Sequence, residues 1–336
     1  MSERRRHWAA ALSTAAILLL AACTTSGSAD PVPNLPQDQH CGTADGDRRW
    51  LGQALAGWQV VVRDFLKSAE HRLPQIVTYD SRCSYTLAAP SGSPAQWSVA
   101  RHGGEITLPN GGKIPPAPNA FNAATEAHNF VVMSLPSIWR PVAPASEIPL
   151  EWFLEGVLFH ELSHAYQSVV TPELSFPHLH REYGLPESVN DDSVQEAFQT
   201  NAAYVREYQS ERDLLFRAAS APTDVEARAF ACEALAKLRT RRARHFTGSS
   251  SEWALVDEIS LTTEGLGEWV SYSWLTQARG LAPSLVLSKL RGRFWSQEQG
   301  LAIFLTVDRL VPHWQRRLFS RSPATAEHLL ALACGR

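Results

Sequence analysis

Residues 150–170 read LEWFLEGVLFHELSHAYQSVV, and this stretch determines what the rest of the chain must provide. Its apolar residues recur every three or four positions, which is the spacing of one face of a helix. It contains an HExxH pattern, His160-Glu161-Leu162-Ser163-His164. On a helix, His160 and His164 lie one turn apart on the same face, so both imidazoles can reach a single metal ion.

Glu161 gives an independent indication of a site. On a helical wheel it falls inside the apolar stripe, between Val157 and Ala165. A carboxylate on the buried side of a helix costs free energy unless some interaction compensates for its lost hydration. A metal-bound water beside Glu161 would provide that interaction, whereas an ordinary surface helix would place its glutamates on the exposed side.

A second acidic pattern follows in the segment Thr263-Glu264-Gly265-Leu266-Gly267-Glu268-Trp269. Glu264 and Glu268 are four residues apart, so a helix carries both on one face. The flanking residues are mostly apolar, which predicts a buried helix on which a glutamate needs a partner.

HELSH and EGLGE together resemble the zincin metallopeptidases, and among them the gluzincins. The resemblance implies a zinc ion held by His160, His164 and Glu264, with one coordination position left for water. It also implies that Glu268 orients a ligand histidine from behind. Glu161 is then the general base, which later passes its proton to the leaving amine.

The third zinc ligand has an alternative in Glu196, which is closer to HELSH in the sequence than Glu264 is. The metzincin pattern fails, because the position of its third histidine holds Val170. Choosing Glu264 makes the helices at 193–247 an insertion between the two ligand helices. The EGLGE pattern favours Glu264. The glutamate that is not a ligand is expected to pair with the arginine-rich segment 239–244.

The chain is β-rich before the motif and helical after it. We expect short strands over 75–140, including a hairpin around His102-Gly103-Gly104 and a strong strand at 130–135. The resemblance implies that this strand is the sheet edge along which zincins lay an extended peptide. The expected fold is α+β and zincin-like, a small N-terminal sheet followed by a mainly helical layer (149–336) carrying HExxH, in a single domain over 41–336. Helices are expected near 47–72, 149–170, 193–219, 223–247, 252–279, 298–319 and 323–333.

Other polar residues near the motifs have less specific interpretations. His178 and His180 could line the cleft or belong to a surface loop between Pro172 and Pro186. Tyr272 could stabilise a transition state or pack in the core. Asp191-Asp192 is most simply the cap of a helix that begins near residue 193.

The N-terminus predicts export. Residues 1–22 combine three arginines with an apolar run, as a signal peptide does. They end in Leu20-Ala21-Ala22-Cys23, which resembles a bacterial lipobox and implies lipidation of Cys23. Residues 23–40 are small, polar and proline-rich and are expected to form a tether. The resemblance implies a lipid-anchored protein of the cell envelope, and Thr24 favours the outer membrane, facing the periplasm.

Four further cysteines permit two disulfides in an exported protein, with three possible pairings. We predict Cys41–Cys83 and Cys232–Cys334, because each bond would link residues within one half of the chain.

Composition excludes several classes of function. The 336 residues are 44% hydrophobic and 19% charged, as in a globular protein. The net charge is −3 and no basic block stands out, so a nucleic acid is not the expected partner. The resemblance carried by HELSH and EGLGE implies a zinc-dependent peptidase acting on peptides or proteins. The alternatives are a catalytically inactive zincin-fold lipoprotein that binds or scaffolds, and a zinc hydrolase of a non-peptide amide.

Overall fold

The computed structural model describes residues 33–36, 41–68, 73–89, 94–125, 129–289 and 293–335. The predicted signal peptide, the lipidation residue Cys23 and most of the predicted tether lie outside them. The described residues fall within one compact unit, Pro31–Arg336, and this unit is α+β, as predicted. In the part of the chain described, no helix has both the length and the apolar character that crossing a bilayer requires.

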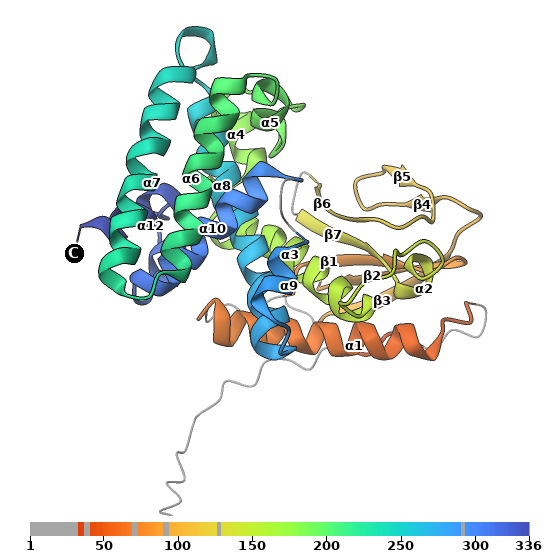
Figure 1. The fold of residues 1–336 in the computed structure, drawn as a ribbon. Coiled ribbons are helices and arrows are strands. Elements are labelled where there is room, and N and C mark those ends of the chain that lie inside the picture. The colour runs from red at the N-terminus through yellow and green to blue at the C-terminus, as the bar shows by residue number, and fades with distance from the viewer. Residues whose placement is uncertain are drawn as a thin grey trace, which may run out of the picture. The chain divides into compact units, whose positions relative to one another are not determined.

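The β-rich part forms a five-stranded sheet in the order β3–β2–β1–β7–β6 (Figure 1). β1 and β7 run parallel, whereas the other neighbouring strands are antiparallel. The strands are β1 Gln75–Tyr79, β2 Cys83–Ala88, β3 Gln96–Arg101, β6 Ala120–Ala124 and β7 Asn129–Ser134.

The sheet corrects two expectations. The strand at 130–135 is internal, because β7 pairs with β1 on one side and with β6 on the other. β6 is the edge instead. The hairpin around His102-Gly103-Gly104 does not form, because β3 pairs with β2. β4 (Ile106–Thr107) pairs with β5 (Lys113–Ile114) across the turn at Asn110-Gly111-Gly112, where Gly111 has a φ of +82°.

Both faces of the sheet are covered. Along β7, Val131 and Met133 join the main core, whereas Phe130 and Val132 join a smaller core that includes Ile106 of β4. This alternation follows from the two-residue period of a strand. α1 (Asp45–Val60) runs along the sheet, and α3 (Leu150–Val170) packs against β6 and β7 (Figure 1).

The rest of the described chain is mainly helical. Its α-helices are α2 Pro136–Trp139, α4 Phe176–Tyr183, α5 Ser193–Phe198, α6 Ala202–Ser220, α7 Asp224–His245, α8 Trp253–Ser273, α9 Pro283–Leu287, α10 Trp295–Leu310, α11 Gln315–Leu318 and α12 Ala326–Cys334. The helix expected at 193–219 is two helices, because Asn201 caps a new one by accepting the N–H groups of Ala203 and Tyr204. α4 forms where a loop was expected; the Ser175 side chain caps its start and Gly184 ends it with a φ of +64°.

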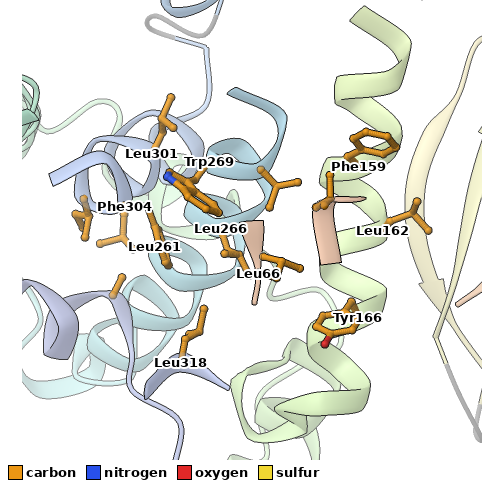
Figure 2. Close-up of a cluster of buried hydrophobic side chains, with 14 of the residues drawn as sticks. Leu66, Phe159, Leu162, Tyr166, Leu261, Leu266, Trp269, Leu301, Phe304 and Leu318 are labelled. Carbon is orange, nitrogen blue, oxygen red and sulfur yellow. The ribbon is translucent and has the colours of Figure 1, made fainter. Parts of the chain in front are cut away.

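α8 packs between α3 and α10 in the main core. Figure 2 shows Phe159, Leu162 and Tyr166 of α3 on one side of this cluster and Leu301 and Phe304 of α10 on the other, with Leu261, Leu266 and Trp269 of α8 between them. Gly265 of α8 and Gly300 of α10 allow the two backbones to touch. A Cβ atom on Gly265 would lie 2.6 Å from the carbonyl carbon of Gly300.

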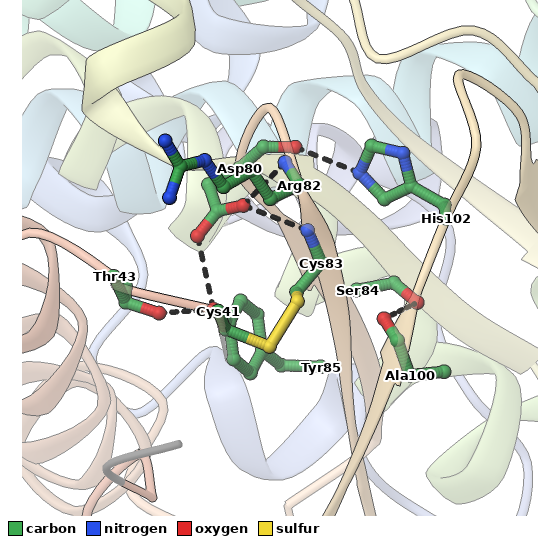
Figure 3. Close-up of a disulfide and its surroundings, with 9 residues drawn as sticks. All are labelled: Cys41, Thr43, Asp80, Arg82, Cys83, Ser84, Tyr85, Ala100 and His102. Carbon is green, nitrogen blue, oxygen red and sulfur yellow. Dashed lines mark hydrogen bonds between the residues drawn. A yellow bond between two sulfur atoms is a disulfide. The ribbon is translucent and has the colours of Figure 1, made fainter. Parts of the chain in front are cut away.

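Both predicted disulfides are confirmed. Cys41–Cys83 joins the segment before α1 to β2 (Figure 3), and Cys232–Cys334 joins α7 to α12. Beside the first bond, the Asp80 carboxylate accepts the backbone N–H groups of Arg82 and Cys83 at 2.7 and 2.8 Å and so fixes the start of β2.

Residues 33–36, inside the predicted tether 23–40, pack on the domain. Leu35 is buried in the main core, and the Pro33 carbonyl accepts a hydrogen bond from Trp97 Nε1 at 2.8 Å. This short part of the segment is therefore bound to β3 and the core.

Candidate metal centre

α3 and α8 bring three candidate zinc ligands together. His160 Nε2 lies 3.2 Å from Glu264 Oε2, and His164 Nε2 lies 3.1 Å from Glu264 Oε1. The two Nε2 atoms are 2.9 Å apart. The one-turn spacing on α3 aims both imidazoles at the same carboxylate of α8, so the three side chains converge on one point.

The donor set fits zinc. Two imidazole nitrogens and one carboxylate are a known ligand set for a catalytic zinc ion. Without a metal, the two imidazoles attract protons and the carboxylate stays charged. Burial lowers the pKa of His160, but its contacts with Glu264 and Glu268 outweigh burial and raise it well above the ordinary value. Burial opposes ionisation of Glu264, yet His164 and His160 hold the pKa of this carboxyl well below its usual range.

Glu268 lies behind His160, a position that agrees with what the resemblance implies for this residue. Its Oε1 is 3.3 Å from His160 Nδ1. The distance is that of an ion pair, but the alignment falls short of a hydrogen bond, and Nδ1 has no hydrogen-bond partner among the described residues. Gly267 touches the same ring, because a Cβ atom there would lie 2.8 Å from Nδ1. The second glycine of EGLGE therefore leaves room for the His160 imidazole.

Two further residues contribute to the geometry of the site and were not predicted from the sequence. Gln297, in the first turns of α10, donates through Nε2 to Glu264 Oε2 at 3.1 Å. Gly156, one turn before His160, allows α3 to approach α8, since a Cβ atom there would lie 2.7 Å from Ser271 Oγ. Gly156 precedes HELSH in the sequence and faces α8 in the structure. The helical spacing of residues 150–170 does not by itself reveal this contact.

Glu161 lies beside the convergence point and borders two hollows. One is a cleft of about 560 Å³ and the other a cavity of about 200 Å³; His160 and Gln297 border both as well. Burial raises the pKa of Glu161, although His160 and His164 act against it. No hydrogen bond to another described residue fixes its carboxylate, so it is available to a bound water.

Glu196 does not join the site. It is exposed on α5 and is absent from the ligand group formed by His160, His164 and Glu264. The expectation that the unused glutamate pairs with the arginine-rich helix is also wrong, because α7 uses other acids. Those acids are Glu207, Glu211, Asp257 and Glu327.

The structure distinguishes between the alternative roles that the sequence left open for the other polar residues. His180 borders the cleft, and its Nε2 lies 2.8 Å from the Val189 carbonyl oxygen, whereas His178 does not border it. Tyr272 packs against the core. The expected capping role of Asp191-Asp192 is not seen, because Asp192 precedes α5 without a side-chain cap and Asp191 borders the cleft instead.

Comparison of the chain with protein-family models, with curated proteins and with solved structures finds no match.

Proposed function

We propose that this protein is a zinc-dependent metallopeptidase of the gluzincin type, with a zincin-like fold. The observation that carries the proposal is the convergence of His160, His164 and Glu264 in a cleft that Glu161, without a hydrogen-bond partner among the described residues, also borders. Ligand histidines, a carboxylate ligand and a free carboxylate next to substrate-sized space are what metal-assisted hydrolysis needs.

Each residue then has a defined task. His160, His164 and Glu264 would hold zinc, which when bound lowers the pKa of water and polarises the substrate carbonyl. Glu161 accepts the proton of the attacking water and donates it to the amine that leaves. Glu268 orients His160 from behind, and Gln297 holds the Glu264 carboxylate in place.

A peptide is the substrate class that the surroundings of the site fit best. Residues 121–124 of β6 border the cleft, and β6 is the outer strand of the sheet on that side. An outer strand offers backbone N–H and C=O groups to an extended chain laid beside it. The substrate would therefore pair with β6, and not with β7 as the resemblance implies.

The proposed setting is the bacterial cell envelope, with the protein anchored through lipid on Cys23 and facing the periplasm from the outer membrane. Two disulfides support an oxidising compartment, because such bonds persist mainly in exported proteins.

The first test is zinc content, measured by mass spectrometry on the purified protein. We expect one zinc per chain, lost in His164→Ala and Glu264→Ala and retained in Glu196→Ala, the matched control. A well-folded wild type that takes up no zinc would refute the proposal, and loss of zinc in Glu196→Ala alone would move the ligand to α5.

The second test separates metal binding from catalysis. Glu161→Gln should keep its zinc and lose roughly 10²–10⁴-fold in peptide hydrolysis, the range expected for a general base. Full hydrolysis by this variant would remove Glu161 from the mechanism. Zinc binding by the wild type without turnover of any peptide in a pool would favour a binding protein.

A further inference from the structure

The cleft beside the metal centre carries more negative charge than the proposed chemistry uses. The described residues that border it include four carboxylates and no lysine or arginine. The two charges of a zinc ion are balanced by Glu264 and Glu161. Glu187 and Asp191 remain, and neither forms an ion pair with a described residue.

Asp191 is the more informative of the two, because it is partly buried whereas Glu187 is exposed at the rim. Burial, together with the negative charges of Glu264 and Asp192, raises the pKa of Asp191 to about 7. His164 offsets this only in part, and no lysine or arginine among the described residues that border the cleft lies there to pair with the Asp191 carboxylate. A cationic nitrogen entering the cleft would do so.

Gln167 provides an independent observation in the same cleft. It lies on α3 three residues after His164, so its side chain is on the ligand face of the helix. Only 1% of the residue is exposed, and neither Oε1 nor Nε2 has a hydrogen-bond partner among the described residues. A buried amide without hydrogen-bond partners is unfavourable, so a ligand that pairs with it binds favourably. A primary amide accepts and donates at once, which matches the N–H and C=O of a peptide unit.

We infer that the cleft selects a peptide with a cationic nitrogen next to the cleaved bond, held by Asp191, while Gln167 binds a peptide unit of the same substrate. This rests on the proposed peptidase function. The cationic nitrogen is either a lysine or arginine side chain or the free α-amine of the peptide. Glu187, at the rim, adds attraction for the same charge.

The test measures binding, so that it does not depend on turnover. Three fluorescent peptides of alanine background are titrated into zinc-loaded Glu161→Gln protein by anisotropy. One is acetylated and carries a single lysine, one is acetylated with norleucine in its place, and one is the norleucine peptide with a free N-terminus. The lysine or norleucine position is scanned along the peptide. We expect one cationic peptide to bind at least about tenfold more tightly than the neutral one at low salt. The identity of that peptide distinguishes a side-chain cation from an α-amine.

Two variants in this background assign the effect. Asp191→Asn should remove the preference for the cation. Asp192→Asn should keep it, because the side chain of Asp192 does not border the cleft. Gln167→Met should weaken all three peptides by a similar factor, because it removes the contact to the peptide unit and leaves the charge.

The inference is overturned by equal binding of the three peptides, by a preference that survives Asp191→Asn, or by loss of zinc in Asp191→Asn, which would assign that residue to the metal centre. An unchanged affinity in Gln167→Met would remove Gln167 from the binding site. If wild type cleaves the neutral and lysine peptides with the same kcat/KM, the inference fails and the peptidase function stands. If it binds the lysine peptide through Asp191 but cleaves none, the peptidase function fails and the cation site stands.

Discussion

The helix α8 takes part in two clusters of buried charge that differ in how the charge is compensated. The arginine cluster consists of Glu211, Arg241, Arg242 and Asp257. The metal cluster consists of His160, His164 and Glu264. In the first, the fully buried guanidinium of Arg241 contacts both Glu211 and Asp257, and Arg242 contacts Asp257 as well.

In the metal cluster, the groups among the described residues that pair with Glu264 and can carry positive charge are imidazoles, which are cations only when protonated. The arginine cluster is complete within the chain, whereas the metal cluster needs a proton or a metal ion from outside. Burial and charge alone therefore do not indicate a functional site. What indicates it is a buried charge that the chain leaves without a permanent partner.

Breaking the arginine cluster should cause the greatest loss of folding stability. Arg241→Met leaves Glu211 and Asp257 buried without their shared cation, so the free energy of unfolding should fall by about 3–5 kcal/mol. Urea denaturation of the metal-free protein measures this. His164→Ala is the matched change in the metal cluster and should cost much less in the metal-free protein, while abolishing zinc binding. A larger loss from His164→Ala than from Arg241→Met would contradict the distinction.

Substituting the two glycines of EGLGE separates the effect on zinc affinity from the effect on folding stability. Gly267→Ala places a methyl group against the His160 ring and should weaken zinc binding about 10–100-fold, as loss of a supporting contact does. Gly265→Ala instead pushes α8 away from α10 and should lower stability by about 1–3 kcal/mol, the usual cost of overpacking. Competition with a chelator measures the first effect, and urea denaturation measures the second. Equal zinc affinity in both variants would show that the space beside His160 is not needed.

The smallest expected effect is the acid response of the arginine cluster. Burial alone would raise the pKa of Asp257, but Arg241 and Arg242 outweigh it and lower the pKa. A lowered pKa in the folded state means that Asp257 contributes stability above its ordinary pKa, near 3.9, and that this is lost as the pH falls through the lower folded value.

Below about pH 4, Asp257→Asn should therefore lose stability less steeply than the wild type, by at most about 1.4 kcal/mol per pH unit. Burial raises the pKa of Glu211 despite Arg241, so Glu211→Gln should not reduce the acid slope in the same way. Unfolding curves between pH 5 and 3 compare the three proteins. Parallel curves for wild type and Asp257→Asn would show that Asp257 has no share in the acid response.

Much of the site could be predicted because its residues follow a local period. HELSH and EGLGE each place their residues at helical spacing, so each motif states which side chains share a face. Gln297 could not be found this way, because its contact with Glu264 depends on how α10 crosses α8. The sequence predicts a helix cap at Asp191, because it cannot show that this residue borders the cleft in the folded chain.

The sheet was less predictable than the helices for a similar reason. The sequence of β7 is strongly β-forming, but its neighbours are set by pairing across long distances in the chain. β6 has the sequence AFNAA, whose alanines have low strand propensity, and it becomes a strand by pairing with β7. The edge that borders the cleft was therefore assigned to the wrong strand.

The bond between Cys41 and Cys83 has a mechanical consequence. A pull on the N-terminal segment first meets the Pro33 and Leu35 contacts and then reaches Cys41. From there the disulfide carries the load directly to β2, inside the sheet, because α1 begins only after Cys41. Tension on the N-terminus would therefore reach the strand pairs on both sides of β2 through the disulfide, without first passing along α1.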